Sequence, residues 1–210
     1  MDLLKRYNTF IFDFDGTLAD TLPICFESFR QVFIKYNGVS LSNQTIESWF
    51  GPSEAGIIKN NLTNPDAFSD ALALYYSIYQ QEHSKFVKEN PEITAMLAKL
   101  SASKKNIAVV TGKGRISYDI SMQCLGLKKV IAFSVTGDDV IQPKPHQEGI
   151  LKALDYFQAK TETAVYFGDS NADIQAANNA QVYSIGVKWF YPRSFSYQPD
   201  RYSFVPMDIF

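Results

Sequence analysis

The 210-residue chain carries 20 basic and 22 acidic side chains, which gives a formal net charge of −2 at pH 7. That balance lacks the basic patches with which proteins bind nucleic acid or anionic membranes, so we expect neither partner. The chain has no apolar leader, no run long enough to span a bilayer and only two cysteines, Cys25 and Cys124, which we expect to be buried. A cytoplasmic protein is the resulting expectation.

The first predicted element is a strand over Thr9 to Phe14. Its aromatic and β-branched residues leave no polar face, which is typical of a strand covered on both sides in a parallel sheet. Asp13 and Asp15 stand at its carboxyl end, and Gly16 ends it. Two buried like charges need a cation or a shared proton, and ligands of open α/β sheets bind at the carboxyl ends of strands. A plain Asp-Gly turn is the alternative interpretation of this stretch.

A helical segment is predicted next, over residues 18–85. Large apolar residues recur at intervals of three and four from Leu22 to Tyr36 and again from Phe68 to Tyr79. The pattern predicts helices over 22–36, ended by Gly38, and over 66–82, with shorter helices at 42–48 and 54–60. We therefore expect an all-helical insertion that interrupts an α/β pattern.

That pattern resumes with a helix from Pro91, capped by Asn90. Short apolar strands then alternate with helices, which predicts a parallel sheet with right-handed crossovers. The expected strands are 107–110, 129–134, 164–167, 182–186 and a short one at 204–206; the expected helices are 91–100, one ending at 124, one ending near 157, and 172–179.

Polar side chains follow several of the predicted strands. The set comprises Asp13, Asp15, Thr111, Lys144, Asp169 and Asp173. It is chemically complete for phosphoryl transfer through an aspartyl-phosphate, because it offers a carboxylate nucleophile, a second carboxyl that moves protons, hard oxygen ligands for Mg²⁺, and a hydroxyl and an ammonium for phosphate oxygens.

Each member of the set also has an ordinary structural interpretation. Thr111 can cap the helix that follows it, Lys144 can be a solvated surface lysine, and Asp173 can oppose a helix dipole. Asp169, at the end of a buried strand, is harder to explain in that way. The order of all these residues along one sheet edge favours the functional interpretation.

The motifs Asp13-Phe-Asp-Gly-Thr-Leu, Thr111, Lys144-Pro145 and Gly168-Asp-Ser-Asn-Ala-Asp173 resemble the four motifs of the haloacid dehalogenase superfamily. The resemblance extends from the first strand to the fifth. The helical insertion is similar to the small cap of that superfamily, and Thr136 to Val140 with Lys144 to His146 resembles its phosphoglycolate phosphatase-like and pyrophosphatase-like branch.

The resemblance implies a Rossmann-like catalytic core over residues 1–17 and 86–210 and a helical cap over 18–85. It implies that Asp13 is the nucleophile and Asp15 the general acid/base, and that Thr111, Gly112 and Lys144 bind phosphate. Mg²⁺ would be bound by Asp13, by the backbone carbonyl of Asp15, and by Asp169, with Asp173 as a ligand or as support.

The implied activity is Mg²⁺-dependent hydrolysis of a small phosphorylated metabolite similar to phosphoglycolate. A phosphomutase of the β-phosphoglucomutase type, an inorganic pyrophosphatase and a non-catalytic phosphate-binding relative remain as alternatives. We expect a monomer or weak dimer. Trp49, Gly51 and Lys59 are candidates for facing the site from the cap, whereas His83, Arg30 and Lys35 are expected on the surface.

Overall fold

The computed structural model describes residues 3–210 and contains a six-stranded sheet in the order β3-β2-β1-β4-β5-β6, in which every neighbouring pair is parallel. The predicted α/β class and parallel sheet are confirmed. The strands are β1 (Thr9–Phe12), β2 (Asn106–Val110), β3 (Phe133–Val135), β4 (Ala164–Gly168), β5 (Tyr183–Val187) and β6 (Arg201–Ser203).

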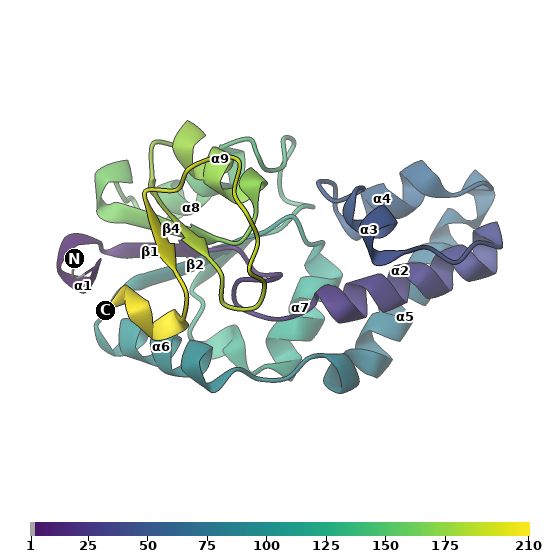
Figure 1. Ribbon diagram of the computed structural model, residues 1–210, viewed down its shortest axis with the longest axis horizontal. Coiled ribbons are helices and arrows are strands. Elements are labelled where there is room, and N and C mark those ends of the chain that lie inside the picture. Colours follow the sequence, from purple (N-terminus) through teal and green to yellow (C-terminus); the bar gives the residue numbers. More distant parts are fainter. Residues whose placement is uncertain (1–2) are drawn as a thin grey trace.

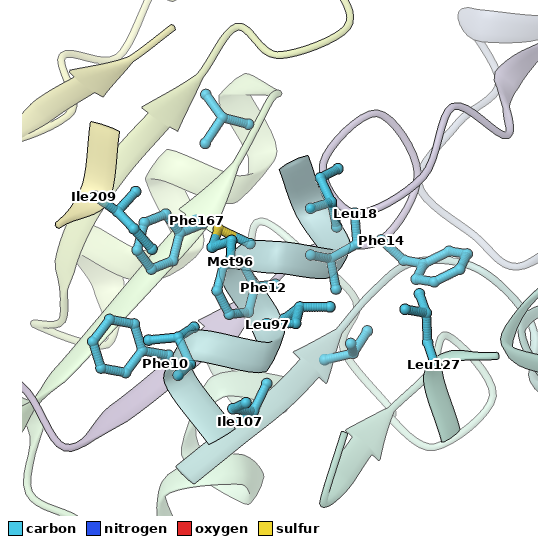
Figure 2. Close-up of a cluster of buried hydrophobic side chains, with 14 of the residues drawn as sticks. Phe10, Phe12, Phe14, Leu18, Met96, Leu97, Ile107, Leu127, Phe167 and Ile209 are labelled. Carbon is cyan, nitrogen blue, oxygen red and sulfur yellow. The ribbon is translucent and has the colours of Figure 1, made fainter. Parts of the chain in front are cut away.

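Helices cover both faces of this sheet (Figure 1). One face packs on α6 (Pro91–Ala102) and α7 (Arg115–Cys124), and the other on α8 (Glu148–Tyr156) and α9 (Asn171–Asn179). Figure 2 shows the buried apolar side chains between the sheet and the face covered by α6 and α7. In this cluster Phe12 and Phe167 stack with ring centroids 4.6 Å apart. Apolar side chains project from both faces of β1 and are covered by the helices on each side. All residues of the strand are therefore buried, as its sequence predicts.

Four helices between β1 and β2 form a separate cluster at the other end of the molecule (Figure 1). They are α2 (Leu22–Asn37), α3 (Asn43–Glu47), α4 (Glu54–Asn61) and α5 (Phe68–Phe86). Phe29 of α2 and Tyr75 of α5 are both buried, with ring centroids 4.6 Å apart. All four predicted helices are present, and α2 is followed, as expected, by Gly38 in the left-handed conformation with φ 70°.

The remaining elements are short. They are α1 (Leu3–Arg6) and the 3-10 turns η1 (Pro65–Ala67), η2 (Leu127–Lys129), η3 (Thr161–Thr163) and η4 (Pro206–Ile209). Helix α1 was not predicted, because its single turn is too short for a periodic pattern. No helix in the described part of the chain is both long and apolar enough to cross a membrane.

Two strand predictions were wrong in their position. The strand expected at 204–206 lies at Arg201–Ser203, and Phe204 is 61% exposed beyond its end. The strand expected at 129–134 begins only at Phe133, because η2 occupies the chain after Gly126. Both are three-residue strands at the edges of the sheet, where few apolar contacts mark the pairing residues.

Two side chains lie elsewhere than expected. His83 is 1% exposed, although a surface position was expected, because α5 lies against α7 and His83 Nε2 is 3.0 Å from the hydroxyl of Ser121. Cys25 is buried as expected, but Cys124 is exposed at the last residue of α7.

Candidate active site

Three carboxylates meet at the carboxyl edge of the sheet. Phe12 and Phe167 are register partners in β1 and β4, so Asp13 and Asp169, which lie just beyond these strands, are brought together. Asp173 joins them from the first turn of α9. One oxygen from each of the three carboxylates lies within 4.8 Å of the others, and all three residues are buried. We call Asp13, Asp169 and Asp173 the carboxylate cluster.

Lys144 supplies an ammonium to this cluster. It comes from the loop between β3 and α8, and its Nζ lies 2.7 Å from Asp13 Oδ1 and 2.5 Å from Asp173 Oδ1. Burial alone would lower the pKa of Lys144, but Asp13 and Asp173 hold it well above its usual value. The interpretation of Lys144 as a solvated surface lysine is therefore wrong.

The cluster holds more negative charge than one ammonium balances. Burial, with the charges of Asp173 and then Asp15, raises the pKa of Asp13 to about 7, although Lys144 opposes the shift. Burial, with Asp173 and Asp13, raises the pKa of Asp169 well above its usual value. Asp169 Oδ2 is buried without a hydrogen-bond partner in the described chain. An unpartnered carboxylate oxygen among acidic side chains fits a hard cation such as Mg²⁺.

Asp173 is bonded more completely than Asp169. Its Oδ2 accepts from the backbone N–H of Ser170 at 3.0 Å and from the Ser170 hydroxyl at 2.6 Å, and its Oδ1 faces Lys144 and the Tyr166 hydroxyl, which is 2.9 Å away. A Cβ on Gly168 would lie 2.3 Å from Asp173 Cβ, so the close approach of this side chain needs glycine there. Asp173 thus fixes Lys144 and the start of α9.

Asp15 does not point into the carboxylate cluster. Its carboxylate accepts hydrogen bonds from the Thr21 hydroxyl and, at 3.0 Å, from Lys113 Nζ. The chain turns just after it at Gly16, whose φ of 80° favours glycine and whose added Cβ would lie 2.5 Å from Asp169 Oδ2. Asp13 and Asp15 both lie beyond Phe12, where β1 ends, so no regular strand holds the two carboxylates on one face.

Lys113 is a residue that the sequence analysis missed. Its side chain is 1% exposed, and besides Asp15 its Nζ lies 3.7 Å from Glu54 Oε1, 3.3 Å from Cys25 Sγ and 4.5 Å from the centroid of the Tyr79 ring. Burial alone would lower the pKa of Lys113, but the neighbouring acidic groups, Asp15 foremost, raise it well above its usual value. The only sign of Lys113 in the sequence is its position two residues after Thr111, a predicted site residue.

Thr111 and Gly112 occupy the loop that follows β2. Thr111 is buried, and its hydroxyl accepts from the backbone N–H of Lys113 at 3.2 Å, which is a local turn contact. Thr111 and Lys144 line the same cavity, of about 10 Å³. Gly112 lies against the chain of the α3–α4 loop, because a Cβ on it would be 3.6 Å from the carbonyl oxygen of Gly51.

Glu54 joins α4 to the loop after β2. It is 5% exposed, its Oε2 accepts from the backbone N–H of Gly114 at 2.6 Å, and its Oε1 accepts from the hydroxyl of Ser117. Of the three residues expected to face the site, Gly51 lies near Gly112. Trp49 packs instead on Phe33 inside the helical cluster, and Lys59 is exposed.

Arg193 is a second missed residue. It lies in the segment between β5 and β6, with Nη2 2.6 Å from Glu47 Oε1 of α3 and Nε 3.6 Å from Asp169 Oδ2. Among the nearby charges, Arg193 most strongly opposes the rise in the pKa of Asp169. No motif or periodicity marks this arginine in the sequence.

The chain matches known proteins over nearly its whole length. Residues 10–187 match the family model described as haloacid dehalogenase-like hydrolase. Pyrophosphatase PpaX of Bacillus mycoides is 28% identical over 186 residues, which are 88% of this chain and 85% of that protein. Pyrophosphatase PpaX of Anoxybacillus flavithermus is 29% identical over 182 residues, 87% of this chain and 84% of that protein.

Solved structures share the fold. A predicted phosphoglycolate phosphatase from Haemophilus somnus superposes with a TM-score of 0.85 at 21% identity, over 97% of this chain and 96% of that one. CbbY from Rhodobacter sphaeroides, in complex with phosphate, has a TM-score of 0.81 at 21% identity, over 94% and 93% of the two chains. The match of residues 10–187 to the family model confirms the family and the hydrolase class that the four motifs predict.

Proposed function

Because this chain belongs to the haloacid dehalogenase-like hydrolase family, we propose that it is a Mg²⁺-dependent phosphatase that hydrolyses a small phosphorylated metabolite similar to phosphoglycolate. The observation that carries the proposal is the contact of Lys144 Nζ with Asp13 Oδ1 at 2.7 Å, beside two further buried carboxylates. The contact supports the proposal, because Asp13 would be the carboxylate nucleophile and Lys144 the cation that binds the phosphate beside it.

In the first half-reaction, a carboxylate oxygen of Asp13 forms a bond to phosphorus while the bond between phosphorus and the leaving oxygen breaks. Asp15 donates a proton to that oxygen, because an alkoxide is a poor leaving group. Lys144, the Thr111 hydroxyl and the N–H of Gly112 would hold the phosphate oxygens. Thr21 and Lys113 both bond Oδ1 of Asp15, so Oδ2 would carry the proton to the leaving group.

In the second half-reaction, Asp15 takes a proton from water, and the water oxygen bonds to phosphorus while the bond to Asp13 breaks. Asp13, Asp169 and the backbone carbonyl of Asp15 would hold Mg²⁺, which when bound supplies positive charge opposite the phosphate oxygens. Asp169 fits this role by its unpartnered Oδ2, whereas Asp173, whose oxygens have donors, would support Lys144.

Residues 18–85 would be the cap of this phosphatase, with residues 1–17 and 86–210 as its core. The hydrophobic cluster that α2–α5 form apart from the sheet supports the division. The bond of Glu54 to Gly114 and the contacts of Lys113 with α2, α4 and α5 join the two parts. A cap in this position would exclude water from the carboxylate cluster during phosphoryl transfer.

Inorganic pyrophosphatase activity is a second candidate, favoured by the similarity to proteins named pyrophosphatase PpaX. It uses the same nucleophile and metal, with phosphate as the leaving group. Phosphate has a lower pKa than an alcohol, so pyrophosphate cleavage would depend less on proton donation by Asp15 than cleavage of an alkyl phosphate.

The proposal predicts that a panel of phosphoglycolate, pyrophosphate and a sugar phosphate contains a substrate that is hydrolysed in Mg²⁺ and not in chelator. Asp13→Asn should abolish turnover with an unchanged far-UV spectrum, because the amide keeps the shape but is no nucleophile. Product analysis of the sugar phosphate separates hydrolysis from a mutase. Activity of Asp13→Asn near that of the unchanged protein would overturn the assignment of the nucleophile.

A further inference from the structure

Arg193 lies where the carboxylate cluster approaches the cap helices. It reaches Asp169 of the core through Nε at 3.6 Å and Glu47 of α3 through Nη2 at 2.6 Å. Lys144 occupies the Asp13 and Asp173 side of the cluster. The two cations therefore contact different carboxylates, and only Arg193 also contacts an acidic residue of the cap helices.

The guanidinium of Arg193 has donors to spare. The Nε–Asp169 separation of 3.6 Å is too long for a hydrogen bond, and Glu47 is the one acceptor that its side chain bonds within residues 3–210. A guanidinium offers five N–H donors in a plane that matches a carboxylate or a phosphate. Its side chain is 30% exposed, so it is accessible from solvent.

Arg193 Cζ lies 5.4 Å from the centroid of the Tyr191 ring, but this contact and the ion pair with Glu47 do not use the remaining donors of the guanidinium. Glu47 is 42% exposed, and an ion pair between two such side chains contributes little to folding because water screens it. A segment outside the regular elements nevertheless brings an arginine to the one cluster carboxylate whose oxygen lacks a partner. An anion of the substrate could replace Glu47 at low cost, since Glu47 can return to water.

We propose that Arg193 binds a second anionic group of the substrate, a carboxylate or a second phosphate, while Lys144 holds the phosphate to be transferred. The inference rests on the proposed phosphatase function and narrows its substrate class to small phosphorylated metabolites with two anionic groups. Arg193 is thus a specificity-determining residue, contributed by the segment between β5 and β6 and not by the cap.

The test compares two substrates that differ only in the second group. Phosphoglycolate carries a carboxylate where 2-hydroxyethyl phosphate carries an uncharged hydroxymethyl group, and pyrophosphate presents a second phosphate instead. The ratio of kcat/KM for phosphoglycolate to kcat/KM for 2-hydroxyethyl phosphate is measured in Mg²⁺ for the unchanged protein, Arg193→Gln, Arg193→Lys and Glu47→Gln.

Arg193→Gln should lower this ratio about 10- to 100-fold, the value of one charge-assisted bidentate contact, mainly through KM for phosphoglycolate. The ratio for Arg193→Lys should lie between those of the unchanged protein and Arg193→Gln. Lysine keeps the positive charge but lacks the two parallel N–H donors of the guanidinium. Glu47→Gln removes the negative charge that pairs with Arg193 on α3 and leaves the guanidinium, so the ratio for this variant should not fall. The ratio of kcat/KM for pyrophosphate to kcat/KM for 2-hydroxyethyl phosphate, measured in the same variants, shows whether Arg193 binds a second phosphate as well as it binds a carboxylate.

Three results would overturn the inference: a ratio near one in the unchanged protein, an unchanged ratio in Arg193→Gln, or equal falls in Arg193→Gln and Glu47→Gln, which would mean that Arg193 only tethers α3. If the unchanged protein hydrolyses phosphate esters in Mg²⁺ and gives any of these three results, the inference fails while the proposed function stands. If no phosphate ester is hydrolysed at all, the proposed function fails and takes the inference with it.

Discussion

At the scale of single residues, Lys113 has the most demanding environment. A buried ammonium costs several kcal/mol unless acidic partners surround it, and Lys113 has Asp15 of the core at 3.0 Å and Glu54 of α4 at 3.7 Å. One ammonium therefore links the proposed acid/base to α4. Its removal would leave two acidic side chains facing each other with no cation between them.

We predict that Lys113→Met destabilises the protein by about 3 kcal/mol, the usual cost of breaking a buried ion pair from one side. Urea unfolding measures the change. Lys59→Met, which removes an exposed lysine from α4, should change the unfolding free energy by less than about 0.5 kcal/mol. Adding Glu54→Gln to Lys113→Met should recover part of the loss; equal small effects of the two lysine variants would contradict the prediction.

The sequence predicted the centre of the site and not its surroundings. Asp13, Asp169 and Lys144 follow strands that could be recognised, and parallel strands bring such residues to one edge. Glu54 and Arg193 could not be predicted, because each meets the site through packing between elements that are distant in sequence. No local pattern encodes such a meeting.

At the scale of elements, the helices were predicted more accurately than the strands. The recurrence of apolar residues at intervals of three and four extends over several turns of α2 and α5, so single residues that depart from it do not hide the helix. Asn90 caps α6 as expected, because its side chain accepts hydrogen bonds from the N–H groups of Glu92 and Ile93. β3 and β6 have three residues each, so the register of their pairing and not their composition fixes their bounds.

The contact between α5 and α7 should be sensitive to acid. Burial, with the nearby charge of Lys113, lowers the pKa of His83 to about 4, whereas in the unfolded chain it is about 6.5. Between pH 6.5 and pH 4, His83 is protonated in the unfolded chain but stays neutral in the folded protein. The stability contribution is therefore complete above about pH 6.5 and is lost as the pH falls toward 4.

We predict that the unfolding free energy of the unchanged protein falls by about 2 kcal/mol more between pH 7 and pH 5 than that of His83→Gln, which cannot take up this proton. Urea titrations at both pH values test this. His146→Gln, at the only other histidine, is the matched control. A pH dependence that is equal in the unchanged protein and in His83→Gln would refute the assignment.

At the scale of the whole molecule, the proposed binding of Mg²⁺ to the carboxylate cluster would couple metal binding to stability. Protons and Mg²⁺ compete for the same oxygens, and the pKa of Asp13 is about 7. We predict that Mg²⁺ raises the melting temperature more at pH 8 than at pH 6, because binding to the folded state stabilises it by mass action. Asp169→Asn should remove most of the increase; an increase that does not change with pH would contradict the prediction.

The place of β1 in the sheet also has a consequence for synthesis of the chain. Thr9 pairs with Asn106 on one side and Ala164 on the other, so β1 leaves the ribosome long before either neighbour. Helices α2–α5 can associate first, because their contacts are local in sequence. Until β2 and β4 are made, β1 is an apolar strand with two unpaired edges, which are prone to aggregation. Asp13 is thus translated well before β4, and a nascent chain that stops before β4 would carry it without Asp169 or Asp173.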